Sequence, residues 1–360
     1  MNKKTTVGLY IHIPFCLSKC PYCDFYSVKY GNKAAKTYKE AVSRNLSFYN
    51  GKFDTAYFGG GTPILLWKEI CELLETIDIA PKAEITIEAN PCMAKREILT
   101  ALRQSGVNRI SFGVQSLNDT ELKSLGRIHT AGAAVKAIDL AHSCGFDNIS
   151  ADIMLGIEGQ TVKSTLETLE RLTKLPLTHI SAYMLKIEEN TPYAKASLDL
   201  PGEEETCEIY LNTVNYLEAK GIKQYEISNF ARNGYACAHN LKYWRCEEYL
   251  GIGPASHSFY KGKRFFVKRD IEAFCESRVQ QTETEDERPA GAEEYAMLRL
   301  RLCEGLDLKE YGKRGGNAGE MSENLKKLPK NLVFMKNDTI SLTAEGFLVS
   351  NAVIGALLGY

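Results

Sequence analysis

The sequence predicts an α/β fold, a partial (β/α)6 TIM-like barrel followed by a small C-terminal helical, winged-helix-like domain. From residue 7 to residue 184, short β-rich runs alternate with longer helical patterns. This alternation is typical of parallel βαβ units. Six such units are too few to close an eight-stranded barrel, so the barrel is expected to stay open. The chain of 360 residues has room for this domain and an appendage.

Each expected element follows from its own pattern. Strands are expected at residues 7–13, 55–58, 84–89, 109–112, 148–154 and 179–184, and helices at 34–48, 65–77, 95–105, in two stretches ending near 141, and at 162–175. A helix at 203–221 and a strand at 224–227 follow, and a polar, acidic linker is expected at 280–291. After it come a helix at 293–302, a β-wing near 332–342 and a packed terminal helix at 347–360. We therefore divide the chain into a barrel core (1–200), an extension (201–280) and a C-terminal domain (281–360).

Composition excludes several classes of protein. The formal net charge of −1 gives no field to recruit nucleic acid. Met1–Leu9 lacks the long apolar segment of a signal peptide, and no apolar run approaches the roughly 18 residues of a membrane span. Eleven cysteines without a secretion signal favour the reducing cytoplasm. Transient membrane contact through the apolar tail is the alternative for residues 347–360.

Three of the cysteines form the strongest motif, Cys16-x3-Cys20-x2-Cys23, directly after the first strand. An iron–sulfur cluster normally takes four thiolates, so three leave one iron of a [4Fe–4S] cluster open. That iron can chelate the amino and carboxylate groups of S-adenosylmethionine (SAM), whose reductive cleavage yields a 5′-deoxyadenosyl radical. The alternative is a zinc site with His12 as the fourth ligand.

Polar and glycine residues recur where the other strands end, which is the functional edge of such a barrel. The run Gly59–Pro63 follows the second strand and would let the backbone approach a ligand, or form a tight turn. Glu88, Gln115, Arg127 and Asp152 are candidate partners for SAM, and singly each could be an ordinary surface or capping residue. Their shared position predicts one site.

The segment from Tyr10 to Ser27, YIHIPFCLSKCPYCDFYS, resembles the radical SAM family of oxygen-independent coproporphyrinogen III oxidases and their relatives. So do GGGTP (59–63), EANP (88–91), RISFGVQS (109–116), LGRIH (125–129) and DIMLG (152–156), and the resemblance spans nearly the whole chain. It implies that Tyr10, Gly60 and Glu88 contact a cluster-bound SAM. It also implies that a second SAM site is lined by Tyr22, Gly61, Thr62, Gln115, Arg127 and Asp152.

Within this family the chain is most similar to the heme chaperone subgroup. Only nine residues precede Tyr10, Phe25 stands where the oxidases have a fourth cysteine, and Lys186 replaces a small residue. The subgroup implies a protein that binds heme and passes it to heme-requiring acceptor proteins, with the cluster and SAM as a control element. The alternatives are a coproporphyrinogen dehydrogenase-like oxidoreductase that makes protoporphyrinogen IX and needs an electron donor, and a radical SAM enzyme acting on another substrate. No catalytic residue is identified.

The motif His239-Asn240-x-x-Tyr243-Trp244 is typical of the same subgroup, as is the downstream segment GIGPASH (251–257). His239 is the predicted heme ligand, because neutral imidazole commonly binds heme iron. Two aromatic residues could flank the porphyrin, and Lys242 or Arg245 could pair with its propionates. The alternative is that His239 hydrogen-bonds backbone in a buried turn. Weaker ligand candidates are His257, Cys237 and Cys246.

Overall fold

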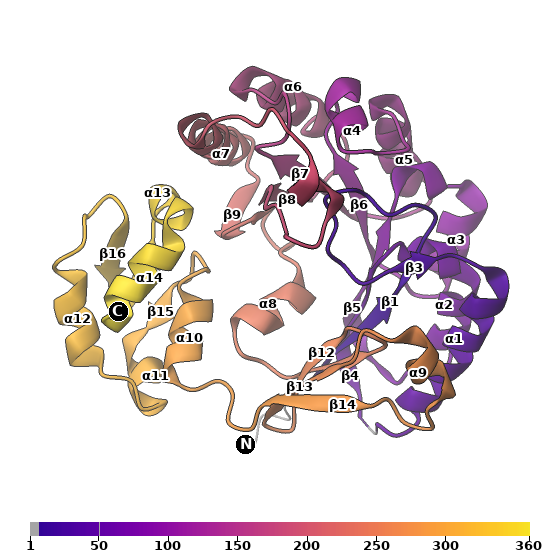
Figure 1. Cartoon of the computed structure of the whole chain (residues 1–360). Coiled ribbons are helices and arrows are strands. Elements are labelled where there is room, and N and C mark those ends of the chain that lie inside the picture. The colour runs from indigo at the N-terminus through magenta and orange to yellow at the C-terminus, as the bar shows by residue number, and fades with distance from the viewer. Residues whose placement is uncertain (1–6, 50) are drawn as a thin grey trace.

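The protein is described by a computed structural model that covers residues 7–49 and 51–360. Residues 1–6, part of the stretch in which no signal peptide is predicted, lie outside the described residues. The main feature is a twelve-stranded sheet in the order β14-β13-β12-β11-β1-β4-β5-β6-β7-β8-β10-β9. It curves into an open barrel, and the C-terminal domain lies beside its open side (Figure 1).

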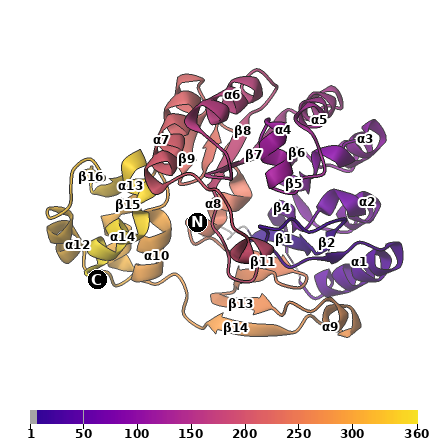
Figure 2. The same ribbon diagram turned by 45° about the horizontal axis from the view of Figure 1, so that its top comes forward.

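The six predicted βα units form the centre of this sheet and are parallel throughout. Their strands are β1 (Val7–Ile13), β4 (Phe53–Gly60), β5 (Ile79–Ala89), β6 (Arg109–Gln115), β7 (Asn148–Leu155) and β8 (His179–Met184). The connecting helices are α1 (Asn32–Leu46), α2 (Trp67–Leu74), α3 (Arg96–Gln104), α4 (Asp119–Ser124), α5 (Ala131–Ser143) and α6 (Val162–Leu172). These helices cover the convex side of the sheet (Figures 1 and 2). The predicted partial barrel is confirmed.

The barrel strands alternate between apolar and polar side chains, and this alternation locates the core. Residues pointing outward pack against the helices and are fully or nearly fully buried, including Leu9, Ile11, Phe58, Ile87, Ile110, Phe112, Ile149 and Ile180. Their neighbours along each strand point inward and are polar, including Thr55, Thr86, Glu88, Arg109, Ser111, Ser150, Asp152, His179 and Ser181. Because side chains alternate faces with a period of two, these strands build an apolar layer outside and a polar lumen inside.

The sheet extends beyond the predicted barrel at both edges. After α7 (Glu203–Ala219), β9 (Lys223–Glu226) and β10 (Asn229–Ala231) add antiparallel strands beside β8. On the other edge β11 (Tyr249–Ile252) pairs in parallel with β1, and β12 (His257–Tyr260), β13 (Lys263–Val267) and β14 (Thr282–Asp286) follow in antiparallel order. The linker prediction for 280–291 is therefore corrected, since an exposed edge strand suits the same polar composition.

Helix α8 (Ala238–Trp244) carries the predicted heme-binding motif and lies on the concave side of the sheet (Figure 1). The carboxylate of Glu84 on β5 accepts hydrogen bonds from the backbone N–H groups of Ala238 and His239, both at 3.1 Å. Nζ of Lys242 is 2.9 Å from Oδ2 of Asp54 on β4. These contacts anchor α8 to β4 and β5 inside the lumen of the barrel.

The C-terminal domain contains α10 (Ala292–Arg299), α11 (Leu308–Lys313), α12 (Ala318–Leu325), α13 (Ala344–Leu348) and α14 (Ser350–Leu358). A small sheet of β15 (Leu306–Asp307), β16 (Val333–Lys336) and β17 (Thr339–Leu342) provides the expected wing. The apolar tail packs inside this domain, with Phe347, Val353 and Leu357 buried. Within 7–49 and 51–360, no helix has both the length and the apolar character needed to cross a bilayer.

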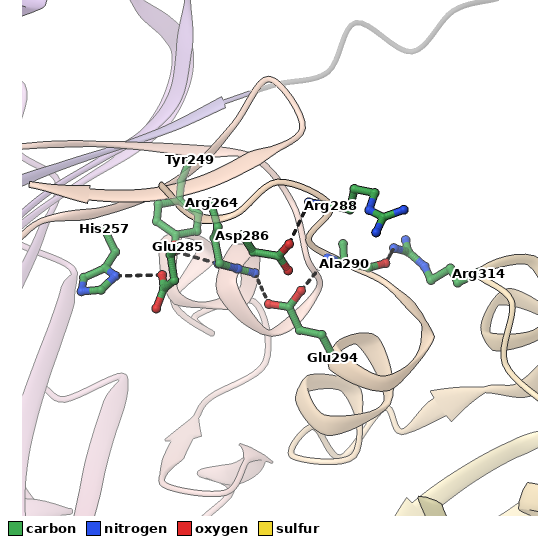
Figure 3. A network of polar contacts seen from close by, with 9 residues as sticks. All are labelled: Tyr249, His257, Arg264, Glu285, Asp286, Arg288, Ala290, Glu294 and Arg314. Carbon is green, nitrogen blue, oxygen red and sulfur yellow. Dashed lines mark hydrogen bonds and ion pairs between the residues drawn. The ribbon is translucent and has the colours of Figure 1, made fainter. Parts of the chain in front are cut away.

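An ion pair with hydrogen bonds around it joins this domain to the edge of the sheet (Figure 3). Nη2 of Arg264 on β13 is 2.6 Å from Oε1 of Glu294 on α10. Arg264 also donates to the Tyr249 hydroxyl at 3.2 Å, and Arg314 donates to the carbonyl of Ala290 at 2.8 Å. The Arg264–Glu294 pair therefore holds α10 against β13, and the Arg314 contact joins the end of α11 to the segment that leads into α10.

Candidate functional site

A cavity of about 630 Å³ opens at the carboxyl ends of the parallel strands. All three motif cysteines line it. So do eight of the nine predicted SAM residues: Tyr22, Gly60, Gly61, Thr62, Glu88, Gln115, Arg127 and Asp152. Strands β4 to β7 carry Gly60, Glu88, Gln115 and Asp152, and neighbouring loops carry the rest, because parallel strands end at one edge of the sheet.

The loop bearing the cysteines is held by its own backbone. A short parallel pair of β2 (Phe15–Cys16) and β3 (Val28–Lys29) brackets it, and the N–H of Cys23 donates to the carbonyl of Cys20 at 3.1 Å. The hydroxyl of Thr62 is 3.6 Å from Sγ of Cys16, and Nη1 of Arg127 is 3.3 Å from Sγ of Cys20. Both groups can donate hydrogen bonds to sulfur. At Cys23, burial raises the pKa of the thiol.

His12 is not available as a fourth ligand to zinc. Its Nδ1 is 3.0 Å from the hydroxyl of Tyr10, and its Nε2 is 2.9 Å from the carbonyl oxygen of Tyr26. Desolvation lowers the pKa of His12 to about 4, so the ring is neutral and both nitrogens are used. The zinc alternative therefore lacks the ligand it requires.

The glycine run at the end of β4 needs glycine at two positions. Gly60 adopts φ +114°, and its N–H donates to Oε2 of Glu88 at 3.1 Å. A Cβ atom at Gly61 would lie 2.6 Å from the carbonyl oxygen of Phe15. Gly61 and Thr62 donate their N–H groups to the carbonyls of Ile13 and Phe15, both at 2.8 Å. The run therefore packs backbone against the cysteine loop, which a side chain would prevent.

Glu88 lies on the inner face of β5 with its carboxylate held by two donors. The hydroxyl of Tyr57 donates a hydrogen bond to Oε1 at 2.8 Å, and the backbone N–H of Gly60 donates to Oε2. Burial raises the pKa of Glu88 to about 7 despite these hydrogen bonds. A carboxyl group with this pKa changes charge near neutral pH, so its interaction with a cation in the cavity depends on pH.

Asp152 faces the same cavity from β7, and Arg127 faces it from the loop after α4. Asp152 accepts hydrogen bonds from the hydroxyl of Ser111 at 3.0 and 3.2 Å, and burial raises the pKa of its carboxyl group. Arg127 donates to the carbonyl of Gly113 at 2.8 Å, while its buried Nε has no hydrogen-bond partner. Gln115, at the end of β6, adopts φ +67°, a left-handed conformation that costs a non-glycine residue energy and is common in functional sites.

Tyr10 is the one predicted SAM residue absent from the cavity lining. It lies on the inner face of β1, where its hydroxyl contacts His12 and its ring stacks on His239 at a centroid distance of 6.3 Å. The sequence-based prediction also missed lining residues, notably Tyr57, Arg109, Ser111 and Ser181. The signal that could have found them is the polar residue at every second position of β4, β6 and β8.

The predicted heme ligand His239 lies inside the lumen. Its side chain is fully buried, with Nδ1 2.8 Å from Oγ1 of Thr55 and Nε2 2.7 Å from the hydroxyl of Tyr243. Desolvation lowers the pKa of His239 to about 3. Neither ring nitrogen is left for an iron atom, so the structure speaks against direct ligation and for the alternative of a buried, hydrogen-bonded histidine. Its two partners are side-chain hydroxyls from β4 and α8 rather than backbone groups, and the neutral ring donates to one of them and accepts from the other.

Large apolar side chains surround the mouth of the cavity. Leu17, Phe25, Ile128 and Tyr183 line it and are between 42% and 66% exposed. Lys19 and Arg269 line the same mouth. Exposed apolar residues gathered at one opening, with cations beside them, are typical of a surface that receives a ligand or partner. We refer to these four apolar residues as the apolar rim.

Comparison with known proteins agrees with this geometry. Residues 10–172 match the Radical SAM superfamily. The chain is 35% identical to the heme chaperone HemW of Bacillus subtilis (strain 168) over 97% of this chain and 98% of that protein. It is 35% identical to the heme chaperone HemW of Escherichia coli (strain K12) over 86% of each. Coproporphyrinogen III oxidase (HemN) of Escherichia coli, a radical SAM enzyme, shares the fold with a TM-score of 0.81 and 21% identity, covering 99% of this chain and 91% of that one.

Proposed function

This chain belongs to the family of heme chaperones named HemW, and from that premise we propose that it binds heme and passes it to heme-requiring proteins. The observation that carries the proposal is the near-complete overlap with these relatives, since both the barrel and the C-terminal domain are shared. The apolar rim supports it, because a porphyrin needs flat apolar contacts and cations for its propionates.

Membership of the Radical SAM superfamily implies a [4Fe–4S] cluster and SAM. We propose Cys16, Cys20 and Cys23 as the cluster ligands. The donor set fits, because three thiols from one loop face one cavity and two of them already have donors at sulfur. When bound, the cluster supplies an electron to the sulfonium of SAM.

We propose that the protein orients SAM with side chains from four strands. Glu88 is placed to pair with the ammonium group of SAM, and the unpartnered Nε of Arg127 can donate to a carboxylate or hydroxyl group. Asp152 and Gln115 offer acceptors for ribose or adenine groups. Tyr10, Tyr22, Gly60, Gly61 and Thr62 complete the set carried over from the family resemblance. A second SAM in the same cavity belongs to this proposal.

The shared fold with coproporphyrinogen III oxidase makes oxidative decarboxylation the second candidate function. Phe25 weighs against it. This side chain is 66% exposed at the mouth of the cavity, at the position where the oxidases carry a fourth cysteine. If SAM is cleaved, an electron donor is a required partner. Eleven free thiols fit a reducing compartment, and we place the protein in the cytoplasm.

One anaerobic experiment separates the two functions. The reconstituted protein is titrated with hemin, and in parallel it is incubated with coproporphyrinogen III, SAM and a reductant. A chaperone should give a saturable Soret band with hemin and should form protoporphyrinogen very slowly or not at all. Rapid formation of protoporphyrinogen without hemin binding would replace the chaperone assignment with the oxidase.

A further inference from the structure

A heme carrier needs a ligand for the iron, and the histidines of this chain are unequally suited to the task. His12, His129, His179 and His239 are buried. Both ring nitrogens of His179 have partners, the hydroxyls of Ser150 and Tyr225 at 2.8 Å each, as was found for His12 and His239. Nε2 of His129 contacts the carbonyl of Val114 at 3.0 Å, and its Nδ1 has no hydrogen-bond partner but is buried, so burial alone sets this ring apart from an exposed ligand. Among the residues described, only His142 and His257 expose an imidazole ring.

We propose that Nε2 of His257 is an axial ligand of heme iron, on the concave face of the sheet at its antiparallel edge. The proposal rests on the heme-binding function given above and names the residue that performs it. It replaces His239 as the ligand. The side chain of His257 is 54% exposed, and its Nε2 has no hydrogen-bond partner, so the lone pair on this nitrogen can reach an iron atom.

The other ring nitrogen of His257 is held as metal-binding histidines usually are. Nδ1 lies 3.3 Å from Oε2 of Glu285 on β14, and Figure 3 shows the ring turned edge-on to that carboxylate. A carboxylate that accepts the Nδ1 proton fixes the tautomer, orients the ring and makes Nε2 a stronger donor to a metal. The Phe266 ring stacks on the imidazole at a centroid distance of 5.5 Å and an angle of 30°. Phe266 therefore adds a flat apolar surface beside the iron ligand.

The sheet register places His257 on the lumen side. Tyr249 faces the lumen, because its ring meets Tyr243 of α8 at a centroid distance of 4.5 Å. Phe259 pairs with Tyr249, and His257 lies two residues away on the same strand, so all three side chains share one face. Phe266 is the cross-strand partner of His257 and joins them.

The register also fixes how far along the sheet His257 lies. Strand β11 runs parallel to β1 and ends at Ile252, and His257 begins β12 after a short turn. The antiparallel pairing of Tyr249 with Phe259 sets His257 opposite Gly251, which pairs with Tyr10, so His257 lies level with the middle of β1, three residues before that strand ends at Ile13. Arg269 follows β13 by two residues and lines the cavity, and its Nη2 is 3.8 Å from Oδ2 of Asp24, next to Phe25 of the apolar rim.

Cations for the propionates lie next to the proposed ligand. Lys268 and Arg269 follow Phe266 in the chain, and their side chains are 57% and 63% exposed. Each is paired with a single exposed carboxylate that a propionate can replace. His142, by contrast, lies in the last turn of α5 on the convex side and has no ring contact among the aromatic pairs of the described residues.

The test compares three variants of the full, cluster-loaded chain in anaerobic hemin titrations. His257→Ala is expected to weaken binding at least about 10-fold and to remove the histidine-bound Soret spectrum, which added imidazole should restore. Glu285→Gln keeps the shape but weakens the Nδ1 interaction, and a loss of about 10-fold is expected, as for other partners of ligating histidines. His142→Ala is the matched control and should bind hemin as the wild type does. Cluster absorbance and SAM binding, unchanged in all three, report that the variants are folded.

The outcomes separate this proposal from the function on which it rests. If the wild type shows no saturable hemin binding, both are wrong. If the wild type binds hemin and His257→Ala binds it with the same affinity and spectrum, only the ligand assignment is wrong. A loss confined to His142→Ala would also overturn it.

Discussion

Replacing His239 by alanine should damage the fold and leave hemin ligation intact. The imidazole is fully buried and bonds the hydroxyls of Thr55 and Tyr243 at 2.8 and 2.7 Å. Each buried hydroxyl left without a partner costs about 1–3 kcal/mol, so the substitution should cost about 2–6 kcal/mol. Domains are stable by only about 5–15 kcal/mol, so much of the free energy of unfolding would be lost.

The dependence of this loss on pH identifies its origin. The ring is neutral in the folded state because burial lowers the pKa of His239 to about 3, whereas the unfolded chain protonates it near 6.5. Below pH 6.5 the unfolded state binds one more proton at His239 than the folded state does. The free energy of unfolding therefore decreases by about 1.4 kcal/mol for each unit by which the pH is lowered, on account of His239. The wild type should show this slope between pH 6 and pH 4, and His239→Ala should lose this contribution.

The assay is urea unfolding of the reconstituted protein, followed by far-UV circular dichroism at pH 7 and pH 5, with a hemin titration at pH 7. His142→Ala, an exposed substitution, should change the unfolding free energy by no more than about 0.5 kcal/mol. The reasoning is refuted if His239→Ala unfolds like the wild type but loses the hemin spectrum, because the histidine would then act as ligand rather than as packing.

Three further predictions concern the cavity. Cys16→Ala should abolish a stable [4Fe–4S] cluster, because only two thiolates of the motif remain, whereas Cys71→Ala should retain the cluster. Iron and sulfide analysis of the reconstituted variants checks this, and stoichiometric zinc without sulfide in the wild type would contradict the cluster assignment. SAM should bind more tightly as the pH rises from 6 to 8, because the pKa of Glu88 is about 7 and its carboxylate form pairs with the ammonium group of SAM. The substitution Glu88→Gln should weaken SAM binding about 10-fold, the equivalent of 1.4 kcal/mol, and should remove this dependence on pH. A calorimetric titration of Glu88→Gln that matches the wild type would exclude this role for Glu88. Gly61→Ala should destabilise the cysteine loop, because the added Cβ would meet the carbonyl of Phe15 at 2.6 Å, and normal cluster yield in this variant would show that the loop can move.

The sequence by itself determined the barrel and the position of its site. Apolar residues at every second position and regularly spaced helices require parallel βα units, because these patterns bury one face of each element whatever the remote contacts are. The cysteine spacing and the glycine run are local, so their chemistry is readable without coordinates. The edge strands β11 to β14 were harder to predict from the sequence, because they are short and are stabilised by pairing with strands far away in the chain.

Only the tertiary structure decided which histidine faces solvent. The HNxxYW motif has the composition of a heme site, yet α8 inserts into the lumen, where Thr55 from β4 takes one nitrogen of His239. That contact spans 184 positions in the chain and depends on β4 and α8 meeting across the barrel. The sequence ranked His257 only as a weaker ligand candidate, because its partners Phe266 and Glu285 reach it only through antiparallel pairing at the edge of the sheet. Local patterns specify elements, but the burial and hydrogen bonding that decide what a side chain can bind arise when distant elements pack together.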